Sequence, residues 1–211
     1  MRSLSSNKTA AVHVTGLFDN HDEALDAVRA LEEAGISADN ISLISNNTNG
    51  QYAGDAVRED QSTITGVETG AGVGAVAGGG AGLLTGLGLL AIPGVGPVVA
   101  GGWLTATLVG VLGGAAAGGV AGGIVDALME SGIPEEEAQA YSEAIRRGST
   151  LIVVRCDENE RQKAEAIFDE WARVDIRKRR NAYIDEGWEG FNASGTPYTS
   201  DQIEQERRRW L

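Results

Sequence analysis

A run of 57 residues without a charged side chain, from Thr69 to Val125, constrains the fold of this 211-residue chain more than any other feature. Along this run, and just before it, glycines recur at every fourth residue in two series. Because a period of four is close to the 3.6 residues of an α-helical turn, each series forms a stripe on one helical face, against which another helix can pack closely. The predicted helix-packing residues are Gly66, Gly70, Gly74, Gly78, Gly82 and Gly86, then Gly102, Ala106, Gly110, Gly114, Gly118 and Gly122.

A turn is predicted at the centre of the uncharged run, in the segment IPGVGP at residues 92–97. Proline and glycine interrupt helices and favour turns. The sequence therefore predicts a glycine-zipper helical hairpin with arms at about Gly66–Ala91 and Val98–Met129, each longer than the roughly 20 residues that cross a bilayer. The predicted turn residues are Pro93, Gly94, Gly96 and Pro97.

Two environments can bury such a hairpin. We expect insertion into a bilayer, with two crossings that leave both flanking segments on one side. The basic segment Arg177–Arg180 then places that side in the cytoplasm, since basic residues favour it. The alternative is a soluble cytoplasmic assembly in which hairpins of many copies bury one another. Each glycine destabilises a water-exposed helix by about 1 kcal/mol relative to alanine, so these helices need tight packing against other helices.

The segments on either side of the hairpin both carry β–α–β patterns. In the first, Asn20 and Gly35 delimit a helix between the strand-like segments AVHVT and ISLIS. In the second, a helix from Pro134 precedes the strand-like TLIVVRC, Asp157 caps another helix, and Val174–Arg177 is a fourth predicted strand. Two such units predict an α+β fold, a ferredoxin-like domain with helices on one face of a four-stranded sheet, split by the inserted hairpin.

The expected organisation therefore has six segments. They are a disordered tail at 1–10, the first half of the α/β domain at 11–45, a linker at 46–65, the glycine-zipper hairpin at 66–130, the second half of the domain at 131–177, and a C-terminal tail at 178–211.

These features together resemble a family of bacterial general stress or heat-induced stress proteins, which in cyanobacteria are low-temperature-induced proteins. The similarity covers roughly Val12–Arg177 and is carried by LFDNHDEALDAVRALEEAGI, by IPGVGP, and by GIPEEEAQAYSEAIRRGSTLIVV. The resemblance implies a role in stress and a link to membranes. It implies no catalytic residues.

No pattern in the sequence indicates a catalytic, cofactor or metal site. His13 and His21 are eight residues apart with no cysteine nearby, whereas zinc ligands are more closely spaced. Cys156 stands at a strand end beside Asp157, and we expect the adjacent Arg155 to point away because side chains alternate along a strand, which disfavours a reactive thiol. The glycine string GAGVGA has no preceding strand and no following lysine, so it is not a phosphate-binding loop. Asp126 continues the second glycine series, and we expect it to face water.

Charge narrows the possible partners further. The net charge of −13 and the pI near 4.5 oppose binding to nucleic acid phosphates. We expect a protein that is not an enzyme, uses no cofactor and does not bind nucleic acid, and the sequence identifies no small-molecule substrate. Its predicted partners are itself and a lipid bilayer, in a membrane-associated, self-assembling stress protein. The alternative is a soluble scaffold or shell whose hairpins form a buried oligomeric core.

Overall fold

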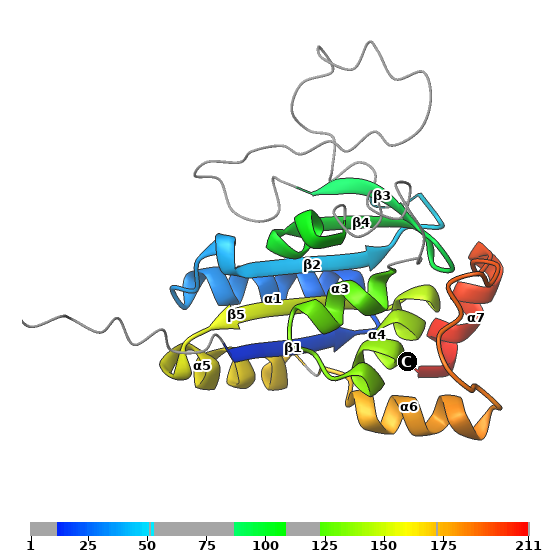
Figure 1. Ribbon diagram of the computed structural model, residues 1–211. Coiled ribbons are helices and arrows are strands. Elements are labelled where there is room, and N and C mark those ends of the chain that lie inside the picture. Colours follow the sequence, from blue (N-terminus) through cyan, green and yellow to red (C-terminus); the bar gives the residue numbers. More distant parts are fainter. Residues whose placement is uncertain (1–11, 51, 53–86, 109–122, 172, 211) are drawn as a thin grey trace, which may run out of the picture.

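The computed structural model describes residues 12–50, 52, 87–108, 123–171 and 173–210, which fold into a mixed α+β domain (Figure 1). A five-stranded sheet with the order β1-β5-β2-β4-β3 forms its centre, and every neighbouring pair of strands is antiparallel. The strands are β1 Val12–Phe18, β2 Ile41–Asn46, β3 Gly88–Ile92, β4 Gly96–Gly102 and β5 Thr150–Cys156.

Two helices begin at the polar caps that the sequence predicts. The Asn20 side chain accepts a hydrogen bond from the backbone of Asp22, and Asp157 forms a capping box with Glu160. Residues 103–108 are also helical. The remaining bounds are α1 His21–Glu33, a 3-10 turn at Ala38–Asn40, α3 Ile124–Glu130, α4 Glu135–Arg146, α5 Glu158–Glu170, α6 Ile176–Asp185 and α7 Ser200–Trp210.

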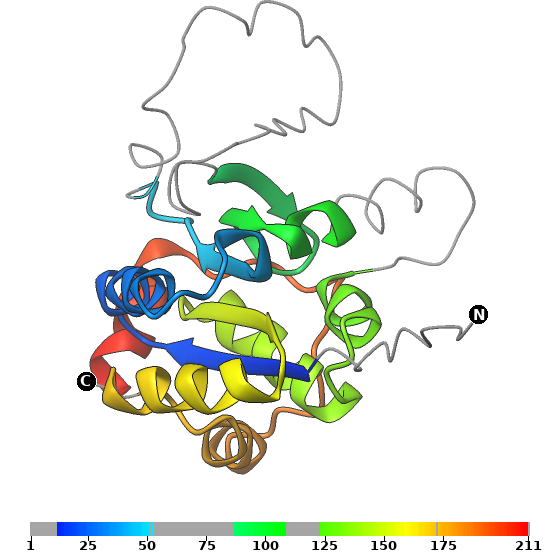
Figure 2. The ribbon, with the colours of Figure 1, turned by 90° about the vertical axis from the view of Figure 1, so that its left-hand side faces the viewer.

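Helices cover both faces of the sheet, so the prediction of helices on one face is wrong. One core contains side chains of α1 and α5, and the other contains side chains of α3, α4 and α6. Figure 2 shows α1 and α3 on opposite sides of the strands. The reason lies in β5, where Leu151 and Val153 enter one core while Ile152 and Val154 enter the other. A strand that is apolar on both faces needs cover on both.

The predicted strand at Val174–Arg177 is also wrong. The backbone N–H of Val174 donates to the carbonyl of Leu17 in β1 at 2.7 Å, so the chain makes one contact of the strand type. Asp175 then accepts from the backbone N–H groups of Arg177 and Lys178 and starts α6. A good helix cap therefore ends the strand pairing after one hydrogen bond.

The apolar stretch next to the predicted turn forms strands, so the helical prediction is wrong for residues 88–91 and 98–102. The turn itself lies where the sequence places it, between Ile92 and Gly96, but it joins β3 to β4. The free edge of β2 offers β4 backbone partners along its length, from Ser42 to Asn46, and such tertiary context overrides local helix preference.

The rest of the predicted hairpin is described only in part. α3 supplies a helix at Ile124–Glu130, while residues 66–86 and 109–122, with most of the predicted zipper glycines, lie outside the described residues. No helix in the described part of the chain combines the length and the apolar character needed to span a bilayer.

Candidate functional site

The edge strand β3 directs part of its backbone away from the sheet. The carbonyl of Pro97 in β4 accepts from the N–H of Asn47 at 2.8 Å, so alternate β4 residues starting at Pro97 face β2. The intervening residues of β4 therefore face β3. Because backbone direction alternates along a strand, Gly88, Leu90 and Ile92 bond to β4, and Leu89 and Ala91 direct their N–H and carbonyl groups to the open edge.

The side chains of β3 divide in the same alternating way. Leu90 and Ile92 pack into the core on the α4 side. Leu89, which is 46% exposed, and Ala91 project into solvent on the other face. The strand GLLAI contains no charge and no proline. Natural edge strands use such residues to prevent pairing with another chain, and β3 has neither within its five residues.

The opposite edge of the sheet, formed by β1, is covered by charged residues. Arg173 donates to the carbonyl of Thr15 at 3.4 Å, and Val174 donates to that of Leu17. A cavity of about 460 Å³ lies beside this edge, lined by acidic and basic side chains and by Tyr141. Burial raises the pKa of Tyr141 to about 12, although its hydroxyl pairs with Thr15 at 2.7 Å.

The C-terminal tail holds the β3–β4 turn against the domain. Gly94 has φ +75°, and a Cβ added there would lie 2.6 Å from the carbonyl oxygen of Asn192. Gly96 has φ +102° and faces the ring of Pro197. The predicted turn residues therefore pack against residues 192–197, which lie between α6 and α7 at the right-hand end of the sheet in Figure 1.

A buried charge cluster fixes this tail. The Arg147 guanidinium, at the end of α4, donates to Glu143 at 2.7 Å, to Glu186 at 2.9 Å and to Glu206 of α7 at 3.3 Å. Burial lowers the pKa of Arg147, but the hydrogen bonds to Glu143 and Glu186 outweigh burial and raise it above its usual value. Arg147 also lies 4.0 Å from the centre of the Tyr183 ring. One arginine thus joins α4, α6 and α7.

A second arginine reinforces the attachment. Arg179 of α6 makes two hydrogen bonds to Asp19, at 2.9 and 2.5 Å, and its guanidinium lies 3.8 Å from the centre of the Trp210 ring. The Trp210 indole donates to Glu206 at 3.0 Å. Sequence reasoning missed these residues, and the one available signal was the concentration of arginines and aromatics near the C-terminus.

Gly102 lies in a strand and is not a helix-packing residue, whereas the helix-packing role of Ala106 stays a prediction. Gly102 ends β4 with φ +88°, and a Cβ there would overlap the carbonyl oxygen of Ile41. Glycine at this position thus permits close approach of two backbones. The predicted stripe would bring two helices together, whereas Gly102 brings the end of β4 close to the start of β2. Ala106 is exposed on the helical segment 103–108.

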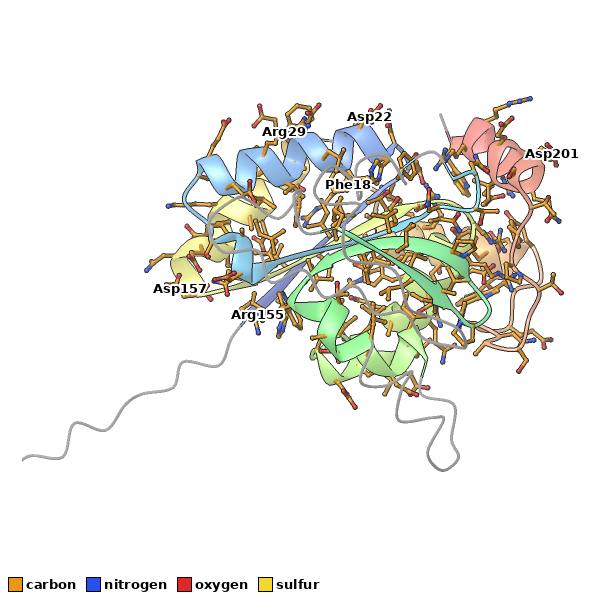
Figure 3. The ribbon with its side chains drawn as sticks, turned by 90° about the horizontal axis from the view of Figure 1, so that it is seen from above. Phe18, Asp22, Arg29, Arg155, Asp157 and Asp201 are labelled. Atoms are coloured by element: carbon orange, nitrogen blue, oxygen red, sulfur yellow. The ribbon has the colours of Figure 1, made fainter. Side chains whose placement is uncertain are left out.

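The candidate chemical residues have structural surroundings. His13 lies beside the Trp103 ring, with centroids 5.7 Å apart, and burial followed by the charge of Arg155 lowers its pKa. Arg155, labelled in Figure 3, covers the same ring at 4.4 Å. His21 is buried, bonds through Nδ1 to Ser45 at 3.0 Å and stacks on Tyr52.

The remaining two candidates are a buried thiol and an exposed acid. Burial, with smaller effects of Glu160 and Asp157, raises the pKa of Cys156 to about 11. Asp126 is exposed and accepts from the N–H of Gly123 at 3.3 Å. Across the described ranges, no group of three or more histidine, cysteine or acidic side chains is placed to hold a metal ion.

No family model, curated protein or solved structure matches the chain. The similarity to bacterial stress proteins therefore stays a prediction from the quoted motifs, and the function has to be argued from the site.

Proposed function

We propose that this chain is a structural protein that assembles with copies of itself. The observation that carries the proposal is β3, an uncharged edge strand with an exposed leucine and outward backbone groups at two residues. Such a strand is a template for pairing with another chain. The buried charge cluster supports the same role, because it joins three helices and the tail into one body and is committed to internal contacts.

The placement of β3 and β4 in the sheet supports protein contact. Residues 88–92 and 96–102, at the centre of the uncharged run, pair with other strands of the domain. The contribution of the glycine-periodic segments to a bilayer contact, and the role in stress, stay predictions from the sequence.

The overall charge is consistent with a discrete assembly. A net charge of −13 repels copies of the chain at most orientations and keeps assembled particles dispersed. Association must therefore use a neutral surface. A ferredoxin-like core fits this scheme, because β1 and β2 run parallel with β5 between them, and the β3–β4 hairpin extends that core at the β2 edge.

Sedimentation velocity of the detergent-free protein over a hundredfold concentration range tests the proposal. We expect a defined oligomer that persists at 150 mM salt, because an uncharged interface is insensitive to screening. A monomer at every concentration refutes self-assembly. Flotation with liposomes after an alkaline wash is the companion measurement, and flotation of a protein that is monomeric without lipid assigns the uncharged segments to the bilayer instead.

A further inference from the structure

We infer that the occupant of the β3 edge is a second copy of the same strand, paired antiparallel about a two-fold axis that passes through Leu90. This inference rests on the proposed self-assembly and specifies its contact surface. It joins the two five-stranded sheets into one continuous sheet across the interface.

The backbone geometry fixes the register. With Leu90 opposite its own copy, Leu89 of each chain lies opposite Ala91 of the other. Leu89 and Ala91 are the two residues whose N–H and carbonyl groups point toward the open edge of the sheet. The hydrogen bond from the N–H of Asn47 to the carbonyl of Pro97 establishes this direction. In an antiparallel ladder, residues opposed in this way exchange two hydrogen bonds. The two such pairs form four hydrogen bonds, and a shift by one residue loses this match.

The side chains agree with this register. Leu89 and Ala91 share one face of β3, so each leucine packs against the alanine of the other chain across the axis. The large exposed leucine meets the small exposed alanine, which avoids both a clash and a gap. Leu90 remains directed into its own core on the other face, and the domain does not have to repack.

Charge selects a second copy as the partner. The described segments beside the β3–β4 turn are residues 46–50 (NNTNG) and residues 192–197 (NASGTP), and neither carries a charge. Thr48 and Pro197 both lie next to Gly96 in the turn. An acidic chain repels its own copy over most of its surface, and this edge gives close approach without opposing like charges. A two-fold arrangement also closes, so it yields a dimer rather than a growing sheet.

Two substitutions test the contact without disturbing the domain. Ala91→Pro removes an outward N–H that β4 does not use, which an edge strand tolerates. Leu89→Lys places a charge on the exposed face. We expect each to weaken dimerisation at least tenfold in sedimentation equilibrium, with an unchanged far-ultraviolet circular dichroism spectrum. The matched control is Ile184→Lys on α6, at a side chain that is 44% exposed, which should leave the dimer intact.

The register has its own test. Leu89→Cys and Ala91→Cys are oxidised separately and as a mixture of the two proteins, with the native Cys156 buried in both. We expect disulfide-linked dimers chiefly in the mixture, because each position faces the other. Wild-type protein that is monomeric overturns both this inference and the proposed function. If the wild-type protein is oligomeric and the oligomer survives both Ala91→Pro and Leu89→Lys, the β3 contact alone is overturned. The same holds if Leu89→Lys abolishes vesicle binding but leaves the oligomer intact.

Discussion

Replacement of Arg147 by methionine should release the C-terminal tail and destabilise the domain. The Arg147 side chain is 8% exposed and its partner Glu143 is fully buried, so the substitution leaves a carboxylate in the core without its principal counter-charge. Glu186 and Glu206 also lose a hydrogen bond, but both retain some contact with solvent. Glu143 keeps a longer ion pair with Arg146, at 3.2 Å, which compensates its buried charge poorly, so this charge dominates the effect.

The expected loss follows from the burial of this pair. Removal of one partner from a buried ion pair costs about 3–5 kcal/mol, because the desolvation cost of the other charge remains. The matched control is Arg161→Met on α5, where the ion pairs with Glu158 and Glu165 are at least one-third exposed on every side chain. Pairs of that kind contribute about 0–1 kcal/mol. Both arginines make ion pairs with acidic side chains, but their replacement by methionine should lower the free energy of unfolding by amounts that differ severalfold.

Urea unfolding followed by tryptophan fluorescence gives both free energies, since Trp188 and Trp210 report on the tail. A third variant, Glu143→Leu combined with Arg147→Met, removes the buried charge and should recover most of the lost stability. The reasoning is refuted if Arg147→Met costs no more than Arg161→Met. It is also refuted if the double variant is as unstable as Arg147→Met alone, because the cost would then not come from the Glu143 carboxylate.

Three further outcomes follow from the same contacts. Gly102→Ala should destabilise the domain by at least about 2 kcal/mol in urea unfolding, because a positive φ and overlap with the Ile41 carbonyl act together; an unchanged midpoint would show that β4 ends differently. The Cys156 thiol, with a pKa raised to about 11 by burial, should react with an aromatic disulfide at pH 8 far more slowly in the native protein than in urea, and equal rates would contradict its burial. Burial raises the pKa of Glu186, but hydrogen bonds from two arginines outweigh burial and lower it below 4.5. The stability that Glu186 contributes is therefore complete above the unfolded-state pKa of 4.5 and lost as the pH falls through the lower folded-state value. Glu186→Gln should flatten that part of the stability–pH curve, and an identical curve would contradict the shift.

Local signals determined the elements whose structure depends on nearby residues. The helices α1 and α5 follow from a polar cap and an apolar stripe, both of which lie within 13 residues. The strand TLIVVRC follows from consecutive apolar residues, and the turn at 93–96 follows from glycine and proline. For the helices and the turn the stabilising backbone contacts are local, so the pattern of the sequence is sufficient. The strand is indicated by its apolar residues, although its backbone partners in β1 and β2 lie more than 100 residues away.

Glycine spacing was ambiguous for a physical reason. A period of four residues is close to the helical repeat of 3.6, but it is also a multiple of the two-residue repeat of a strand. Gly102 is the member of the two series that lies in β3 or β4, and there the free edge of β2, more than 40 positions earlier in the chain, stabilises the strand. The sequence pattern contains no information about that edge.

The tertiary structure alone decided the candidate site. Whether β3 is an exposed edge depends on the strand order, and which of its residues face outward depends on the hydrogen bond between Asn47 and Pro97. The attachment of the tail likewise depends on Arg147 contacting Glu206, which is 59 residues away. Composition and periodicity by themselves determined that the chain has an α/β part, an uncharged part and an acidic net charge. They did not determine which uncharged residues are buried, because burial depends on contacts between segments far apart in the sequence.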